Sequence, residues 1–157
     1  IKVEEGTLRY GRKSAAFVNN NGVIVAAGRM KVPKDISRER EDWNGSSVNY
    51  GDGIIDIMFT AYCPEEQTGR GYSAVAMNTL RVDTKIGTIE KLHPDGQPWH
   101  YKDLRPYVTQ QEIEGKPRLV RKVQESWGPG RESYWRCSAL NPETKSFEEI
   151  PNQPLYG

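Results

Sequence analysis

Apolar and polar side chains alternate along the central part of the chain. Ile57 and its apolar neighbours fall on one face of the pattern, and Asp56 falls on the other, where we expect its carboxylate to be solvated. A period of two residues predicts half-buried β-strands. Three segments carry this pattern in succession and together predict an antiparallel meander: residues 54–63, 72–83 and 88–93.

The N-terminal part of the chain predicts a β-hairpin. Two apolar runs flank the tripeptide Asn20-Asn21-Gly22, residues 15–19 before it and residues 23–32 after it. Asn-Gly between such runs is a strong hairpin signal, because a type I′ turn requires positive φ at both central residues.

The other segments before residue 54 are less regular. Residues 2–10 predict a strand, whereas the charged residues 34–43 predict one or two helical turns. Residues 44–53 are rich in Gly, Ser and Asn, a composition that predicts a loop.

The pattern changes after residue 102. Residues 103–108 and 118–127 favour helix by propensity, and Leu119, Val120 and Val123 are spaced for one buried helical face. Residues 133–140 and 146–150 again predict strands, and residues 151–157 predict an extended tail.

These elements predict one α+β domain over residues 1–150. Its sheet would hold six to eight mainly antiparallel strands, with one or two short helices from residues 102–127 packed on one face. The alternative is an all-β sandwich or barrel in which residues 102–127 form an irregular excursion.

Composition narrows the classes of partner. Lys and Arg total 22 against 21 Asp and Glu in 157 residues, a net charge of +1. A non-specific nucleic-acid binder requires a surplus of basic residues, so we expect no nucleic-acid partner. No apolar run reaches the roughly 20 residues of a membrane-spanning helix, so we expect no membrane span.

The two cysteines, Cys63 and Cys137, both lie at or near the ends of predicted strands. We expect them to form a disulfide, and this is the main reason to expect an extracytoplasmic protein, periplasmic or secreted. Two buried thiols are the alternative. Activation of Cys63 as a nucleophile by His93 or His100 is disfavoured by nearby carboxylates, and no closely spaced ligand pair suggests zinc. We therefore expect no metal and no cofactor.

Two aromatic groups are the candidate binding residues. Trp99, His100 and Tyr101 follow a Pro-Asp-Gly turn, and a second group surrounds a Gly-Pro-Gly segment. Aromatic and arginine side chains dominate protein interfaces. The same residues could instead close the core. The second group consists of Trp127, Arg131, Tyr134 and Trp135.

The sequence contains no complete pair of catalytic nucleophile and base and no complete set of metal ligands near these aromatic groups. The expected function is therefore an exported, non-enzymatic binding protein that acts through a protein partner, of the inhibitor, immunity or adhesin type. One alternative is a small hydrolase or lyase that uses His93 or His100 with Asp95 or Asp103. Another is a subunit of a larger assembly, held by the extended tail.

Overall fold

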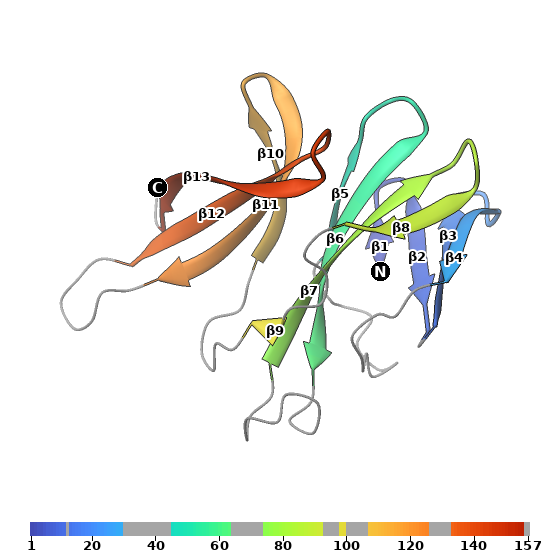
Figure 1. Cartoon of the computed structure of the whole chain (residues 1–157), viewed down its shortest axis with the longest axis horizontal. Helices are drawn as coiled ribbons and strands as arrows, with labels where there is room; N and C mark the ends of the chain where they lie inside the picture. The colour runs from blue at the N-terminus through green and yellow to red at the C-terminus, as the bar shows by residue number, and fades with distance from the viewer. Residues whose placement is uncertain are drawn as a thin grey trace.

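The computed structural model describes residues 1–11, 13–29, 45–63, 74–92, 98–99, 107–125 and 133–155 (Figure 1). Within these ranges every regular element is a β-strand and none is a helix. The strands are β1 (Lys2–Val3), β2 (Gly6–Tyr10), β3 (Ser14–Asn19), β4 (Ile24–Arg29), β5 (Gly45–Asn49), β6 (Ile54–Cys63), β7 (Ala74–Asp83), β8 (Thr88–Lys91), β9 (Pro98–Trp99), β10 (Tyr107–Ile113), β11 (Lys116–Glu125), β12 (Tyr134–Asn141) and β13 (Ser146–Pro154).

The first eight strands form a nearly closed barrel, on the right in Figure 1. Their order is β1-β2-β3-β4-β8-β7-β6-β5, and β9 pairs with β7 outside this path. The pairing of β4 with β8 is parallel, through Ala27 and Thr88, and the other pairs are antiparallel. The barrel nearly closes where its two end strands, β1 and β5, are in contact. Next to this contact, the Ser47 hydroxyl donates a hydrogen bond of 2.7 Å to the Glu5 carboxylate.

Alternation along the strands fills the barrel with apolar side chains. Leu8, Phe17, Ile57, Phe59 and Leu80 are each 1% exposed or less. Complete burial of a side chain of this size contributes about 1.5–3 kcal/mol. The hairpin at Asn20–Gly22 and the meander of β6, β7 and β8 are confirmed. Gly22 has a positive φ of 80°, but Asn20 and Asn21 do not have positive φ, so the turn is not the expected type I′ turn.

The remaining strands form a separate four-stranded antiparallel sheet in the order β10-β11-β12-β13. One face packs on the outside of the barrel, where Leu119 and Leu140 meet Val48 and Met58 in a buried cluster. The opposite face has a smaller core of its own, formed by Val120, Cys137 and Ala139.

The four-stranded sheet is strongly curled around this second core. Gln111 lies on one edge strand and Gln153 on the other, yet their side-chain amides exchange two hydrogen bonds of 3.1 and 2.9 Å. The curl brings the edges together and buries the face turned away from the barrel. The central residues of β11 and β12 are therefore buried on both faces of the sheet, whereas no residue of the edge strand β13 is fully buried.

A buried ion pair joins the two layers. Arg81 donates to both oxygens of Asp56, at 2.8 and 3.0 Å, and the Tyr50 hydroxyl donates to the same carboxylate at 3.0 Å. Arg81 also donates to the Pro142 carbonyl, 2.8 Å away in the β12–β13 turn. The expectation that Asp56 is solvated was wrong: its side chain is 0% exposed, because the second sheet covers the outer face of β6.

The predicted α+β class was wrong, and the fold belongs to the all-β class named as the alternative, but the irregular excursion which that alternative placed over residues 102–127 was also wrong. Strands β10 and β11 occupy much of the region expected to be helical. Leu119 and Val120 are neighbours on a strand that is buried on both faces, and such a strand loses its alternating pattern. Residues 45–49, expected to be a loop, form β5, whereas the helical turns expected over residues 34–43 lie outside the described ranges.

Candidate binding surfaces

The structure describes part of the first predicted aromatic group. The backbone of Trp99 lies in β9 and pairs with Val75 of β7, which places it beside the barrel wall. Four other predicted binding residues lie outside the described ranges: His100, Tyr101, Trp127 and Arg131. The residues of the alternative catalytic site that lie outside them as well are His93, Asp95 and Asp103.

The two described members of the second group lie on opposite faces of β12. Trp135 lies on the face turned away from the barrel and packs against the core that contains Cys137. Its ring contacts Tyr107, with 6.3 Å between the ring centroids, and Tyr107 is 47% exposed. Tyr134 lies on the other face of β12, and its backbone pairs with Glu125 of β11 and Pro154 of β13. Trp135 was among the predicted binding residues, whereas Tyr107, which contacts it, was not.

The predicted disulfide between Cys63 and Cys137 was wrong. Cys137 is a free, buried thiol whose Sγ lies 3.6 Å from the Trp135 carbonyl oxygen. Cys63 ends β6 in the barrel, whereas Cys137 lies in the other sheet on the face turned away from the barrel. Burial raises the pKa of the Cys137 thiol, which keeps it protonated. Without the disulfide, the main reason for an extracytoplasmic location is lost.

A patch of exposed aliphatic side chains lies at one end of the barrel. Val23, Ile24 and Ile86 are 54%, 64% and 71% exposed, respectively. The first two belong to the β3–β4 hairpin and the third to the β7–β8 turn, which lie at the same end of the barrel in Figure 1. The parallel contact of β4 with β8 places these turns side by side, with the Ala27 amide donating to the Gly87 carbonyl at 3.1 Å. We call these three residues the aliphatic tip.

Side-chain hydrogen bonds fix both turns of the aliphatic tip. The Asn19 side-chain oxygen accepts from the backbone amide of Val23 at 3.0 Å. Asp83 does the same in the other turn, where its carboxylate accepts from Lys85 and Ile86 at 2.9 and 3.2 Å. Because these bonds hold the backbone, the aliphatic side chains are presented to solvent on a defined frame.

The aliphatic tip was missed in the sequence, although a signal was present. Ile86 stands between Lys85 and Gly87 in a segment that is otherwise typical of a turn. A large aliphatic residue in a turn has no strand face on which to be buried, and this distinguishes it from the apolar residues of the strands.

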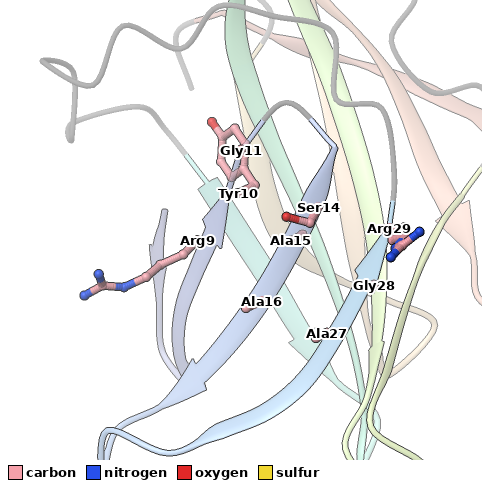
Figure 2. Close-up of a pocket in the computed structure, with 9 residues that line it drawn as sticks. All are labelled: Arg9, Tyr10, Gly11, Ser14, Ala15, Ala16, Ala27, Gly28 and Arg29. Carbon is pink, nitrogen blue, oxygen red and sulfur yellow. The ribbon is translucent and has the colours of Figure 1, made fainter.

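The opposite end of the barrel has an open cleft of about 590 Å³, shown in Figure 2. Tyr10, Ala15 and Gly28 form one row of its lining across β2, β3 and β4. The Arg9 side chain points away from the barrel in Figure 2. Tyr10 packs on Phe59 of the barrel core, with ring centroids 5.1 Å apart. The cleft is also lined from the other face of the same strands, by Arg9, Ala16, Ala27 and Arg29.

The described residues contain no group of His, Cys, Asp and Glu side chains that could hold a metal ion. No helix in this part of the chain is long and apolar enough to cross a membrane. Searches of protein-family models, curated proteins and solved structures find no match to this chain.

Proposed function

We propose that this chain is a non-enzymatic binding protein that recognises a protein partner through the aliphatic tip. The observation that carries the proposal is the exposure of three large aliphatic side chains on two adjacent, rigidly held turns. Single exposed apolar residues are ordinary on protein surfaces, whereas clustered ones mark interaction sites.

The energetics favour a binding role for the aliphatic tip. Burying an exposed aliphatic side chain contributes about 1.5–3 kcal/mol, so partial burial of three such residues on association supplies several kcal/mol. Exposed Asn20, Asn21 and Lys85 surround these side chains in the same turns. An apolar centre with a polar rim is the usual anatomy of a protein interface.

The partner must offer a complementary apolar surface. Specific interfaces bury about 800 Å² on each partner, so the aliphatic tip would form the centre of a larger contact. The exposed Tyr107 beside Trp135 is a second apolar feature, but it lies on the other sheet and serves here as a comparison site.

The test is recovery of a partner by the tagged protein from extracts of its source cells. We expect Ile24→Ser combined with Ile86→Ser to lower the recovery of a specific protein at least tenfold, because these changes remove the apolar centre. Tyr107→Ser is the matched control, since it changes an exposed apolar side chain far from the aliphatic tip.

Stability must be unchanged for this comparison to hold. Both altered sites are more than half exposed, so the melting temperature of the double variant should match that of the wild type. Equal recovery of the same proteins by all three forms would contradict the proposal, as would an equal loss in the Tyr107→Ser control.

A further inference from the structure

We propose that the cleft binds a small, elongated molecule with a carboxylate at each end and an apolar middle. The site lies on the outer face of β2, β3 and β4, at the end of the barrel opposite the aliphatic tip. It therefore does not depend on the function proposed for the aliphatic tip. Its elements are two arginines and the alanines between them.

The strand register places the two arginines at diagonal corners of this surface. Arg9 pairs with Ala16, which pairs in turn with Ala27. Arg29 follows Ala27 by two residues, on the same face of β4. Figure 2 shows the two arginines on either side of the alanines. Neighbouring strands lie about 4.8 Å apart and rise about 3.3 Å per residue, so the two arginine Cα atoms are about 12 Å apart.

The lining of the cleft is positively charged, although the net charge of the chain is only +1. Both Arg9 and Arg29 are exposed, and neither guanidinium has an ion-pair partner among the described residues. No carboxylate of the described ranges lines the cleft. Lys13, which is also exposed, lies in the turn that borders it. An anionic ligand would gain attraction here without displacing an existing ion pair.

Glu90 is the carboxylate that the register brings toward Arg29. Ala27 of β4 pairs with Thr88 of β8 in the parallel direction, so Arg29 and Glu90 stand at corresponding positions two residues further on. Glu90 instead accepts a hydrogen bond of 2.7 Å from Lys145 of the second sheet. The contact with Lys145 thus leaves Arg29 to a ligand.

The middle of the cleft is apolar and hollow. Ala16 and Ala27 present only methyl groups between the two arginines, so the surface is low at this point. The cleft volume of about 590 Å³ is typical of small-molecule sites. An elongated ligand can place its methylene groups on the alanines while each of its ends meets one guanidinium.

Carboxylates fit the ends of this site better than phosphates do. One guanidinium matches one carboxylate through two parallel hydrogen bonds. A phosphate monoester carries a higher charge, and its binding sites often add the backbone amides of a helix N-terminus. The described residues that line the cleft belong to strands and to the β2–β3 turn, and each end offers one arginine. The ligand class is therefore a dicarboxylate.

The probe for the test is suberate, a linear dicarboxylate, with octanoate and suberamide as comparison compounds of the same length. Octanoate lacks one of the two carboxylates, and suberamide lacks both charges. Each compound is titrated into wild-type protein at low ionic strength, where charge pairs are least screened. The backbone amide resonances of Ala16 and Ala27 are followed by ¹⁵N–¹H NMR. We expect suberate to shift them saturably and to bind at least threefold more tightly than either comparison compound.

Arg9→Gln and Arg29→Gln test the two ends of the site, and Ala27→Leu tests its middle. We expect each arginine variant to weaken suberate binding at least threefold, because one guanidinium–carboxylate pair is lost. Ala27→Leu retains both arginines but fills the cleft from an exposed position, and should weaken binding at least tenfold. The control is Lys116→Gln, which removes the same charge from an exposed position of β11 and should leave the affinity unchanged.

Three results would overturn the assignment. One is equal affinity of the wild type for suberate and octanoate, a comparison that does not depend on any variant. Another is unchanged suberate affinity when Arg9→Gln and Arg29→Gln are combined in a protein with the wild-type melting temperature. The third is undiminished suberate binding by Ala27→Leu, because the dicarboxylate would then lie on the arginines outside the cleft.

Discussion

Asp56 illustrates how a single residue connects the two layers of the molecule. Its carboxylate is 0% exposed, while the Arg81 side chain retains 14% exposure. Burial of such a pair is tolerated because every charged group has hydrogen-bond partners, including Tyr50 and the Pro142 carbonyl. Burial, together with the charge and hydrogen bond of Asp56, raises the pKa of the Tyr50 hydroxyl, which stays protonated as a donor.

Removing the carboxylate should be costly. We expect Asp56→Ala to lower the free energy of unfolding by about 3–5 kcal/mol, because Arg81 is left largely buried without its partner. Urea denaturation followed by circular dichroism measures the change. The control is Glu90→Ala, which breaks a roughly half-exposed ion pair of 2.7 Å with Lys145 between the same layers. That loss should be below about 1 kcal/mol, and equal losses in the two variants would refute this account of the junction.

Cys137 is expected to be an inert thiol. In a Cys63→Ser variant, which leaves Cys137 as the single cysteine, the native protein should resist labelling by a thiol reagent at pH 8. The side chain is 0% exposed, and its raised pKa lowers the fraction of reactive thiolate. Denaturant should restore one reactive thiol per chain. Rapid labelling of the folded variant would show that this face of the sheet is open.

Burial of Tyr10 predicts how the free energy of unfolding changes at alkaline pH. Burial raises its folded-state pKa above the unfolded value of about 10. Its contribution to stability is therefore complete below about pH 10 and is lost as the pH rises further toward the folded-state value. We expect the free energy of unfolding to fall less steeply above pH 10 in Tyr10→Phe than in the wild type. Tyr107→Phe, at an exposed tyrosine, is the control, and parallel curves for wild type and Tyr10→Phe would contradict the prediction.

Among the elements, the β10–β11 hairpin shows most clearly why sequence reasoning failed after residue 102. Ile113 pairs with Lys116, which leaves a two-residue turn of Glu114 and Gly115 with φ values of 53° and 78°. These are the positive angles of a type I′ turn, but glutamate is not one of the residues typical of its first position, so the sequence does not predict this turn. The sequence prediction therefore placed separate helices over residues 103–108 and 118–127, whereas residues 107–113 and 116–125 form the two strands of one hairpin.

The same turn provides a test at the level of one hairpin. Glu114→Asn creates the preferred Asn-Gly pair, and asparagine tolerates positive φ better than glutamate does. We expect this change to raise the free energy of unfolding by about 0.5–1 kcal/mol. Glu114→Ala retains the strained backbone and should give no such gain. If both variants behave alike in urea denaturation, the left-handed turn geometry is not what limits this position.

Strands whose two faces differ in polarity were predictable, and a strand with apolar residues on both faces was not. β3 and β8 alternate because one face packs inside the barrel and the other is more exposed. β6 is buried on both faces between residues 55 and 59, but Asp56 on its outer face preserves the alternating pattern. In β11 both faces are buried, so Leu119 and Val120 stand next to each other and imitate a helical stripe. The Gly- and Ser-rich β5 was missed because its inward positions are small.

At the scale of the whole molecule, the chain is a nearly closed barrel with a curled four-stranded sheet against its outer wall. The sequence could not reveal this layering, because it depends on contacts such as that of Arg81 with Pro142, 61 positions apart. The disulfide prediction failed for the same reason. It assumed that two cysteines near strand ends lie close together, whereas Cys63 lies in the barrel and Cys137 in the second sheet. Trp135 was predicted as one of a group of four binding residues, of which the structure describes only Tyr134 and Trp135. The aliphatic tip was not predicted, because it exists only where two turns of the chain meet.

The central claim is that the aliphatic tip contacts a protein partner. The most direct measurement is photo-crosslinking in the source cells, with a photoreactive phenylalanine analogue replacing Ile86 in one form and Tyr107 in the other. The account predicts a discrete protein adduct from position 86 that disappears when Ile24→Ser is added, and no such adduct from position 107. No adduct from position 86, an adduct with lipid alone, or the same protein adduct from both positions would contradict it.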